Sequence, residues 1–334
     1  MGDGPYFDQL RVGQVFDAAP SMTLTAGVAA VHQSIVGDRL RLTLDATLAY
    51  AVAGAVAPLV HPALVCDVAI GQSTLATHRV RANLFYRGLT FHRFPIIGDG
   101  LSTRTEVVAL KQNSAKRDRP PTGLAVLRVT TVDQADRLVL DFYRCAMLPC
   151  SPDAGETGHA DDLSALGPDA ATPAIDPTAD WDAGAFRVRV PGPHFDTGIA
   201  GAVLQSTGDV VSSAPELARL TMNIAATHHD WRVSGQRLVY GGHTIGLALA
   251  QTTRLLPNLA TVLSWQSCDH TGPVHEGETL YSELHVVSAE PMPNGGLLQL
   301  RSLVYAAGAA GRGGRSGSEP DRQVLDWRFT ALQF

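Results

Sequence analysis

The sequence predicts an α+β protein built from two diverged copies of one unit. Three stretches of the first half recur in the second half in the same order, as 95–110 with 273–289, 123–132 with 296–305, and 137–148 with 322–333. One short match would be chance, whereas three in one order indicate a duplication. The matched stretches have the alternating, β-branched-rich character of strands.

Each copy also carries a long Ala-, Leu- and Val-rich segment ahead of its strands. These segments are residues 61–80 in the first copy and 242–257 in the second, where Pro257 ends the run. Their apolar character predicts a buried helix. One helix followed by several antiparallel strands is the order of an α+β unit and not of alternating βαβ units.

The region between the copies has a different composition. Residues 151–185 lack periodicity, contain no Lys or Arg, and are rich in Asp, Pro, Gly and Ala. We expect a surface linker there. The domain organisation we expect is therefore an N-terminal unit at 1–150, a linker at 151–185 and a C-terminal unit at 186–334.

Composition narrows the class of protein. The 334 residues are 45% hydrophobic, carry a formal net charge of −6, and contain no basic run with interleaved aromatic residues, which argues against nucleic acid as a partner. The four cysteines show no CxxC or Cys/His metal spacing. The N-terminus lacks the apolar core of a signal peptide, and the most apolar stretch, 48–65, contains His61 and two prolines. We therefore expect a cytoplasmic protein without a membrane span.

The two copies differ most just before the central helix. Residues 35–45 (IVGDRLRLTLD) align with residues 220–230 (LTMNIAATHHD), both ending in Asp. The opposed pairs that matter for chemistry are Asp38/Asn223, Thr43/His228 and, at the start of the helix, Pro62/Gly242. Only the second copy therefore combines a histidine with a glycine at the helix start.

These residues resemble the MaoC-like, R-specific enoyl-CoA hydratases and dehydratases. That family has G-D-x-N-P-L-H-x-D before its central helix and a [VA]-H-G-M turn into it. The opening FDQLRVGQVF at 7–16 and the strand start GDGLSTRTEV at 98–107 are also similar to the family. The resemblance covers most of the chain outside the linker. It implies a double hotdog fold, in which two antiparallel sheets each wrap around a central helix and form a pseudo-dimer.

The resemblance also assigns a site in the second copy. The family's acid/base aspartate falls on Asn223, its histidine on His228, and its backbone N–H donor to the thioester carbonyl on Gly242. Hydration of an enoyl thioester needs a base for water and a donor for the developing enolate oxygen. A neutral histidine can be that base, and a glycine at a helix N-terminus supplies an N–H with room for close approach. Asn223 cannot transfer protons and can only orient His228 or the water.

Three neighbours are expected to support this site. Asp230 fixes the local turn, Tyr240 can hydrogen-bond near the thioester, and Gly241 precedes the donor glycine. The first copy fails as a site because Thr43 cannot act as the base and Pro62 has no N–H. We expect Asp38 to be a capping or turn carboxylate and the first copy to shape the acyl-chain tunnel.

The leading hypothesis is a lyase of fatty acid metabolism that hydrates a 2-enoyl thioester or dehydrates a 3-hydroxyacyl thioester, on coenzyme A or an acyl carrier. It needs no metal or redox cofactor. The alternative is a non-catalytic acyl-CoA-binding or regulatory protein on the same fold, and a thioesterase ranks third because Asn223 replaces a carboxylate. Arg87, Arg93 and Arg237 are candidates for phosphate binding. A homodimer of such chains is left open.

Overall fold

The computed structural model describes residues 4–114, 119–164, 166–167, 176–293, 295–308 and 320–334. Each half contains one central helix and four long antiparallel strands. In the first half these are α4 (Pro62–Gln72), β3 (Ala82–Phe91), β4 (Gly100–Gln112), β5 (Thr122–Asp133) and β6 (Leu138–Pro149). In the second half they are α7 (Gly241–Leu255), β9 (Leu259–His270), β10 (Thr279–Met292), β11 (Gly295–Ala306) and β12 (Arg322–Gln333). The predicted α+β class, with a helix ahead of the strands in each copy, is confirmed.

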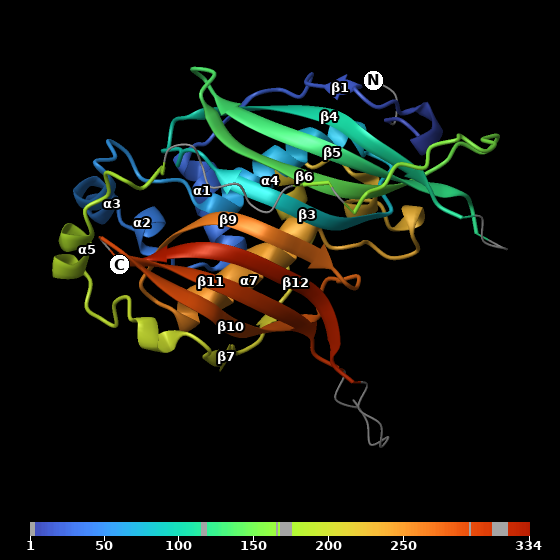
Figure 1. Ribbon diagram of the computed structural model, residues 1–334. Coiled ribbons are helices and arrows are strands. Elements are labelled where there is room, and N and C mark those ends of the chain that lie inside the picture. The colour runs from blue at the N-terminus through green and yellow to red at the C-terminus, as the bar shows by residue number, and fades with distance from the viewer. Residues whose placement is uncertain (1–3, 115–118, 165, 168–175, 294, 309–319) are drawn as a thin grey trace.

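The two sets of strands form one continuous sheet. Its order is β1-β4-β5-β6-β3-β9-β12-β11-β10-β7, and β3 pairs with β9 antiparallel, with Tyr86 opposite Cys268 and Leu89 opposite Trp265. The sheet curves around α4 and α7, which lie together on its inner side (Figure 1). The β3–β9 junction therefore joins the two copies as a pseudo-dimer within one chain.

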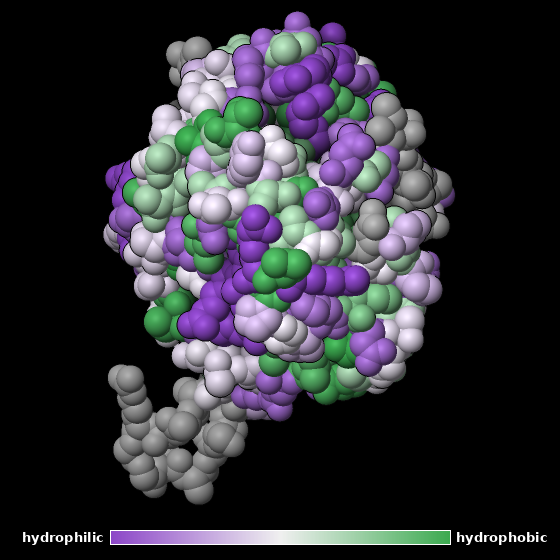
Figure 2. Space-filling view, turned by 90° about the vertical axis from the view of Figure 1, so that its left-hand side faces the viewer, coloured by the Kyte–Doolittle hydropathy of each residue, from purple (hydrophilic) through white to green (hydrophobic). Residues whose placement is uncertain are grey.

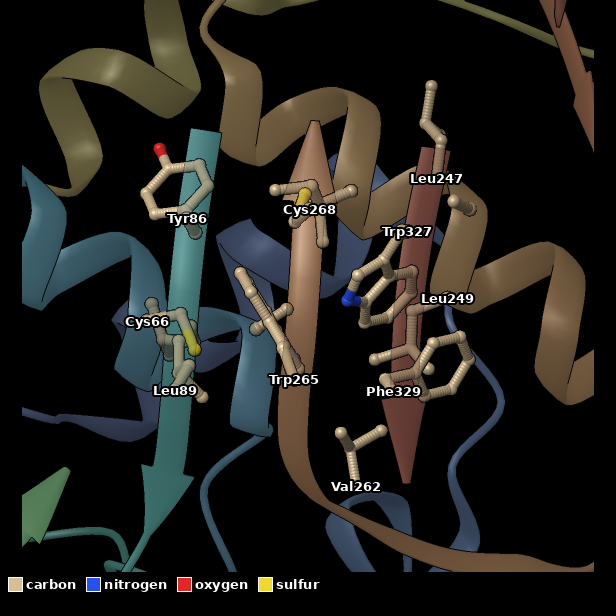
Figure 3. Packing of buried hydrophobic residues seen from close by; sticks show 14 of the residues in the cluster. Cys66, Tyr86, Leu89, Leu247, Leu249, Val262, Trp265, Cys268, Trp327 and Phe329 are labelled. Atoms are coloured by element: carbon tan, nitrogen blue, oxygen red, sulfur yellow. The ribbon is translucent and has the colours of Figure 1, made fainter. Parts of the chain in front are cut away.

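The inner face of the sheet is apolar at alternating positions, as the strand pattern requires. Tyr86 of β3, Trp265 of β9, and Trp327 and Phe329 of β12 lie beside one another toward the helices (Figure 3). The rings of Trp327 and Phe329 stack with centroids 3.8 Å apart. Burying an aromatic side chain of this size stabilises the fold by about 2–3 kcal/mol.

Both central helices are enclosed by protein. Every residue of α4 is buried; Pro62 stands at its first turn, and the His61 Nδ1 atom accepts a hydrogen bond from the Ala63 N–H across 3.2 Å. Gly71 lies where the helix touches the second copy, because a Cβ atom there would be 1.7 Å from the Thr221 carbonyl oxygen. The first copy's helix thus supports the backbone of the second copy's loop.

Shorter elements close the ends of the molecule. The helices are α1 (Ala26–Val36), α2 (Arg41–Leu44), α3 (Ala46–Ala53), α5 (Ala183–Arg189) and α6 (Ala214–Leu220). The short strands are β1 (Val15–Phe16), β2 (Met22–Thr23), β7 (Val203–Gln205) and β8 (Asp209–Val210). The 3-10 turns are η1 (Phe7–Gln9), η2 (Ser73–Ala76), η3 (Thr197–Ile199), η4 (Ala226–His228) and η5 (Trp231–Val233). None of the described helices is long and apolar enough to cross a membrane.

The region between the copies is partly packed against the body. The N–H of Gln112 donates to the carbonyl of His159, so part of this segment extends the edge of β4. Trp181 is buried, and α5 packs against α3. Residues 165 and 168–175 of the expected linker lie outside the described residues.

On the face of the molecule at the α2, α3 and α5 end, hydrophilic and hydrophobic residues are intermixed (Figure 2).

Candidate active site

A cavity of about 260 Å³ lies between the two copies, at the N-terminal end of α7. The second copy supplies Asn223, Thr227, His228, Tyr240, Gly241, Thr244 and His270 to its wall. The first copy supplies Thr74, Thr77, Arg81, Tyr86 and Arg144. A substrate in this cavity would touch both copies of the duplicated unit, so the site belongs to the pseudo-dimer.

His228 is placed and polarised by the backbone. It ends η4, and its Nδ1 atom lies 2.8 Å from the carbonyl oxygen of Leu238. Because a carbonyl oxygen only accepts, Nδ1 carries the proton and Nε2 keeps its lone pair. Burial lowers the His228 pKa to about 4, although the Leu238 carbonyl opposes that shift. His228 is therefore neutral, with a free basic nitrogen, at physiological pH.

Asn223 lies on the same wall, with both of its oxygen atoms already engaged. Its Oδ1 atom accepts from the Ala225 N–H across 3.0 Å, and its backbone carbonyl accepts from His229 Nε2 across 2.6 Å. Its Nδ2 atom has no hydrogen-bond partner among the described residues. Met222, just before it, has a φ of 61°, a strained value for a non-glycine residue. Within the described structure Asn223 does not hydrogen-bond to His228, so its free amide group is available to water or substrate.

The first turn of α7 forms the end of the cavity. Tyr240 and Gly241 line the wall, whereas Gly242 lies one residue deeper, where a Cβ atom would be 2.0 Å from Asp67 Oδ1. The first N–H groups of a helix have no partner within the helix, and they carry the positive end of its dipole. The structure therefore presents two N–H groups here, with Gly241 nearer the cavity than the predicted donor Gly242.

Tyr240 has a buried hydroxyl group close to the Asp67 carboxylate. Its Oη atom makes no hydrogen bond of normal geometry to the described residues, although it lies near enough to Asp67 for a side-chain interaction. Burial, followed by the charge of Asp67 and that interaction, raises its pKa well above the ordinary value, so the phenol stays protonated. Its ring meets that of His228 edge-on, with centroids 5.7 Å apart. A protonated donor thus stands next to the candidate base.

Asp230 lies outside the cavity wall. It caps η5 by accepting from the Arg232 N–H across 2.9 Å, and it pairs with the Arg232 guanidinium across 2.6 Å. That pairing lowers its pKa to about 2. Its position is that of a turn residue, not of a group that contacts substrate.

The first copy holds a buried pair that the motif comparison missed. The Asp38 carboxylate accepts from the Leu40 N–H across 2.6 Å, as a turn carboxylate does, and it also lies 3.1 Å from His61 Nε2. Both side chains are buried and neither lines the cavity. The Thr43 hydroxyl donates to the Leu40 carbonyl. The sequence hid this pair because His61 stands at the helix cap and not at the family's spacing from Asp38.

Sequence reasoning also missed two basic residues of the cavity. Arg144 of β6 and His270 of β9 both line it. His270 has its Nε2 atom buried without a partner, and burial lowers its pKa to about 4. Alignment of the two copies shows Arg144 as an unusual residue, because the buried-strand position it occupies is Phe329 in the second copy.

The expected phosphate-binding arginines are all engaged elsewhere. Arg87 pairs with Asp269 across 2.6 Å, Arg93 approaches Asp133 at 3.7 Å, and Arg237 approaches Glu276 at 3.6 Å. The exposed arginine at the cavity is instead Arg81, whose Nη1 atom donates to the Val233 carbonyl across 2.7 Å.

Comparison with known proteins agrees with this arrangement. No protein-family model matches the chain. It is 28% identical over 321 residues to a β-methylmalyl-CoA dehydratase of Chloroflexus aurantiacus, covering 90% of this chain and 88% of that protein. It is 25% identical over 320 residues to a mesaconyl-CoA hydratase of Cereibacter sphaeroides, covering 91% and 90%.

Solved structures give the same result. The chain is 70% identical to Rv0216, a conserved hypothetical protein of Mycobacterium tuberculosis with a double hotdog fold, with a TM-score of 0.95 and 99% of both chains covered. It is 25% identical to a protein from Chloroflexus aurantiacus described as a MaoC domain dehydratase, with a TM-score of 0.83 and coverage of 99% and 97%. The fold is that of a double hotdog protein. The chain is also similar over nearly its whole length to MaoC-like hydratases and dehydratases, which confirms the predicted resemblance.

Proposed function

We propose that this protein hydrates a 2-enoyl thioester, or dehydrates the corresponding 3-hydroxyacyl thioester, with His228 as the general base. The observation that carries the proposal is the protonated Nδ1 of His228, fixed by Leu238, in a cavity that also contains free donors. The relatives support the reaction class, because both are named as enzymes that hydrate or dehydrate a CoA thioester. The non-catalytic alternative lacks such support.

In hydration, His228 Nε2 takes a proton from water while the water oxygen bonds to Cβ of the enoyl group. The electrons of the Cα=Cβ bond move to the thioester oxygen as an enolate. The protonated imidazole then returns its proton to Cα, and dehydration is the reverse sequence. A pKa of about 4 keeps His228 free as a base at neutral pH and makes its imidazolium a strong acid for that return.

The reaction also needs a hydrogen-bond donor for the enolate oxygen and a group that orients the water, and residues near His228 can supply both. The Tyr240 hydroxyl and the Gly241 and Gly242 N–H groups stand where a helix N-terminus favours negative charge, so we assign them to the enolate oxygen. The free Nδ2 of Asn223 is assigned to the attacking water or the product hydroxyl group. Asp230 holds the turn that carries His228.

The carrier we propose is coenzyme A, as in the names of both relatives. Mesaconate and methylmalate, the acids in those two names, each carry a second carboxyl group. Arg81, exposed at the cavity, is the residue we assign to the carrier's phosphates.

The test is crotonyl-CoA hydration, followed as loss of enoyl absorbance, in the wild type and in His228→Ala. We expect the wild type to turn over and the variant to lose about 10²- to 10⁴-fold in kcat. His285→Ala is the matched control, because His285 pairs with Glu283 on β10 and lies outside the cavity. Equal rates in wild type and His228→Ala would refute the role of His228. Tight acyl-CoA binding without turnover of any enoyl thioester would favour the binding-protein alternative.

A further inference from the structure

Arg144 is a buried cation that the reaction above does not use. Its side chain lies in the row of β6 that faces the helices, opposite Tyr86 of β3 and Leu127 of β5. Only 4% of the residue is exposed, yet it lines the cavity of His228. Burying a charge without a partner is costly, so an arginine at this position calls for an explanation.

The protein provides Arg144 with no counter-charge. Its Nη2 atom donates to the Thr77 hydroxyl across 2.5 Å, its guanidinium also interacts with the neutral Tyr86 hydroxyl, and its Nε atom is buried without a partner. No ion pair joins it to a carboxylate among the described residues, and no Asp or Glu is among the described residues that line the cavity. The Asp67 carboxylate lies against Gly242, interacts with the Tyr240 hydroxyl, and accepts from His32 across 3.3 Å.

The duplication offers an internal comparison. Arg144 stands seven residues after Arg137, and Phe329 stands seven residues after the matching Arg322. Phe329 is fully buried in the second copy, which shows that this position of the unit suits an aromatic side chain. Packing therefore does not require a cation here, and only the first copy has one, at a position that lines the His228 cavity.

We propose that Arg144 is the receptor for a carboxylate at the far end of the acyl group, so that the preferred substrate is an enoyl thioester of a dicarboxylic acid. This inference rests on the proposed function, because it takes the same cavity to hold the acyl group. A guanidinium group matches a carboxylate in geometry and charge, and the Nε–H of Arg144 has no partner among the described residues. Its charge also reaches His228, whose pKa Arg144 helps to lower, so the anion and the base share one compartment.

The size of the cavity agrees with a short acyl group. A volume of about 260 Å³ is at the low end for a small-molecule site, and Thr74, Thr77, Asn223 and Thr244 add polar groups to its wall. A long hydrocarbon chain would place apolar surface against Arg144 and leave the guanidinium desolvated. A terminal carboxylate would instead complete its hydrogen bonds.

The first experiment measures binding without turnover. Calorimetry compares succinyl-CoA with butyryl-CoA, two saturated thioesters that differ in a carboxylate against a methyl group. We expect the wild type to bind succinyl-CoA about 10- to 100-fold more tightly and Arg144→Gln to show a ratio near one. Arg128→Gln is the matched control, because Arg128 lies on the neighbouring strand, is half-exposed, and pairs with Asp141. Equal affinities in the wild type would overturn the proposal.

The second experiment measures catalysis with fumaryl-CoA and crotonyl-CoA, which carry the same coenzyme and the same double bond. The wild type should show the larger kcat/KM for fumaryl-CoA, and Arg144→Gln should abolish that preference. An equal loss on both thioesters would mean that Arg144 contacts the carrier or only supports the fold. Preferential binding of succinyl-CoA without hydration of either substrate would refute the proposed function and leave the carboxylate receptor standing.

A third variant separates the receptor from a structural arginine. Arg144→Met keeps the length of the side chain and removes the charge. A carboxylate receptor is unpaired in the free protein, so its loss should leave the melting temperature unchanged or raise it. A fall of several degrees in Arg144→Met, with the succinyl-CoA preference retained, would assign Arg144 to the fold.

Discussion

The Nδ1 atom of His228 donates its proton to the carbonyl oxygen of Leu238, ten residues later in the chain. This bond fixes the tautomer that a general base needs and holds the ring at the cavity. It uses a backbone carbonyl where many enzymes use a carboxylate, so no negative charge raises the basicity of His228. The His228 pKa of about 4 follows from burial, since the hydrogen bond to a neutral carbonyl offsets only part of that effect.

The pH dependence of catalysis should therefore be displaced to acid. A base works only when it is unprotonated, and lowering its pKa moves the acidic fall in rate to lower pH. We expect kcat/KM for the enoyl thioester to be flat from about pH 6 to pH 8 and to fall below about pH 5. A rate profile between pH 4 and pH 9 measures this. A midpoint near the ordinary histidine value of about 6.5 would contradict the environment described for His228.

Tyr240→Phe should separate catalysis from stability. The hydroxyl makes no hydrogen bond of normal geometry to the described residues but interacts with the Asp67 carboxylate, so removing it should cost only about 1 kcal/mol of stability. If it donates to the enolate oxygen, kcat should fall by about 10²-fold or more while KM changes little. Tyr281→Phe is the control, because the Tyr281 hydroxyl donates to Asp321 outside the cavity. An unchanged kcat would remove Tyr240 from the reaction.

Acid should destabilise the protein before its carboxylates titrate. His243 lies in the first turn of α7 and is fully buried. It has no partner on either ring nitrogen among the described residues, and its pKa is lowered to about 4 by burial and then by His32. Between about pH 6.5 and pH 4 the unfolded chain binds the proton and the folded chain does not, so stability falls as pH falls. The loss is at most about 3 kcal/mol for this residue. Urea unfolding at pH 7 and pH 4.5 should show a smaller difference for His243→Leu than for the wild type.

Gly71→Ala should damage the site from a distance. A Cβ atom at position 71 would overlap the Thr221 carbonyl and approach the Asn223 nitrogen at 3.1 Å. We expect a loss of about 1–3 kcal/mol in the free energy of unfolding and a lower kcat. Gly27→Ala, in α1, meets nothing closer than 3.7 Å and should be neutral or slightly stabilising. Wild-type stability in Gly71→Ala would show that the contact between the copies relaxes freely.

The double α+β architecture could be predicted from the sequence, because the repeat and the strand alternation are local patterns that survive divergence. It also placed Asn223 and His228 on one cavity wall, since both belong to one short loop. It could not place Arg144 or His270, which reach the cavity from strands far away in the sequence. An arginine in a strand ordinarily faces solvent, whereas Arg144 stands in the buried row of β6 between Phe142 and Ala146.

The β3–β9 junction has an evolutionary consequence. In a homodimer of identical units, any change in the wall of one site appears in the other site as well. Fusion into one chain removes that constraint, so Arg144 can stand in one copy while Phe329 fills the core of the other. One copy is then free to specialise in recognising the acyl group while the other retains the proton chemistry. The joined sheet thus lets a symmetric ancestor evolve an asymmetric division of labour.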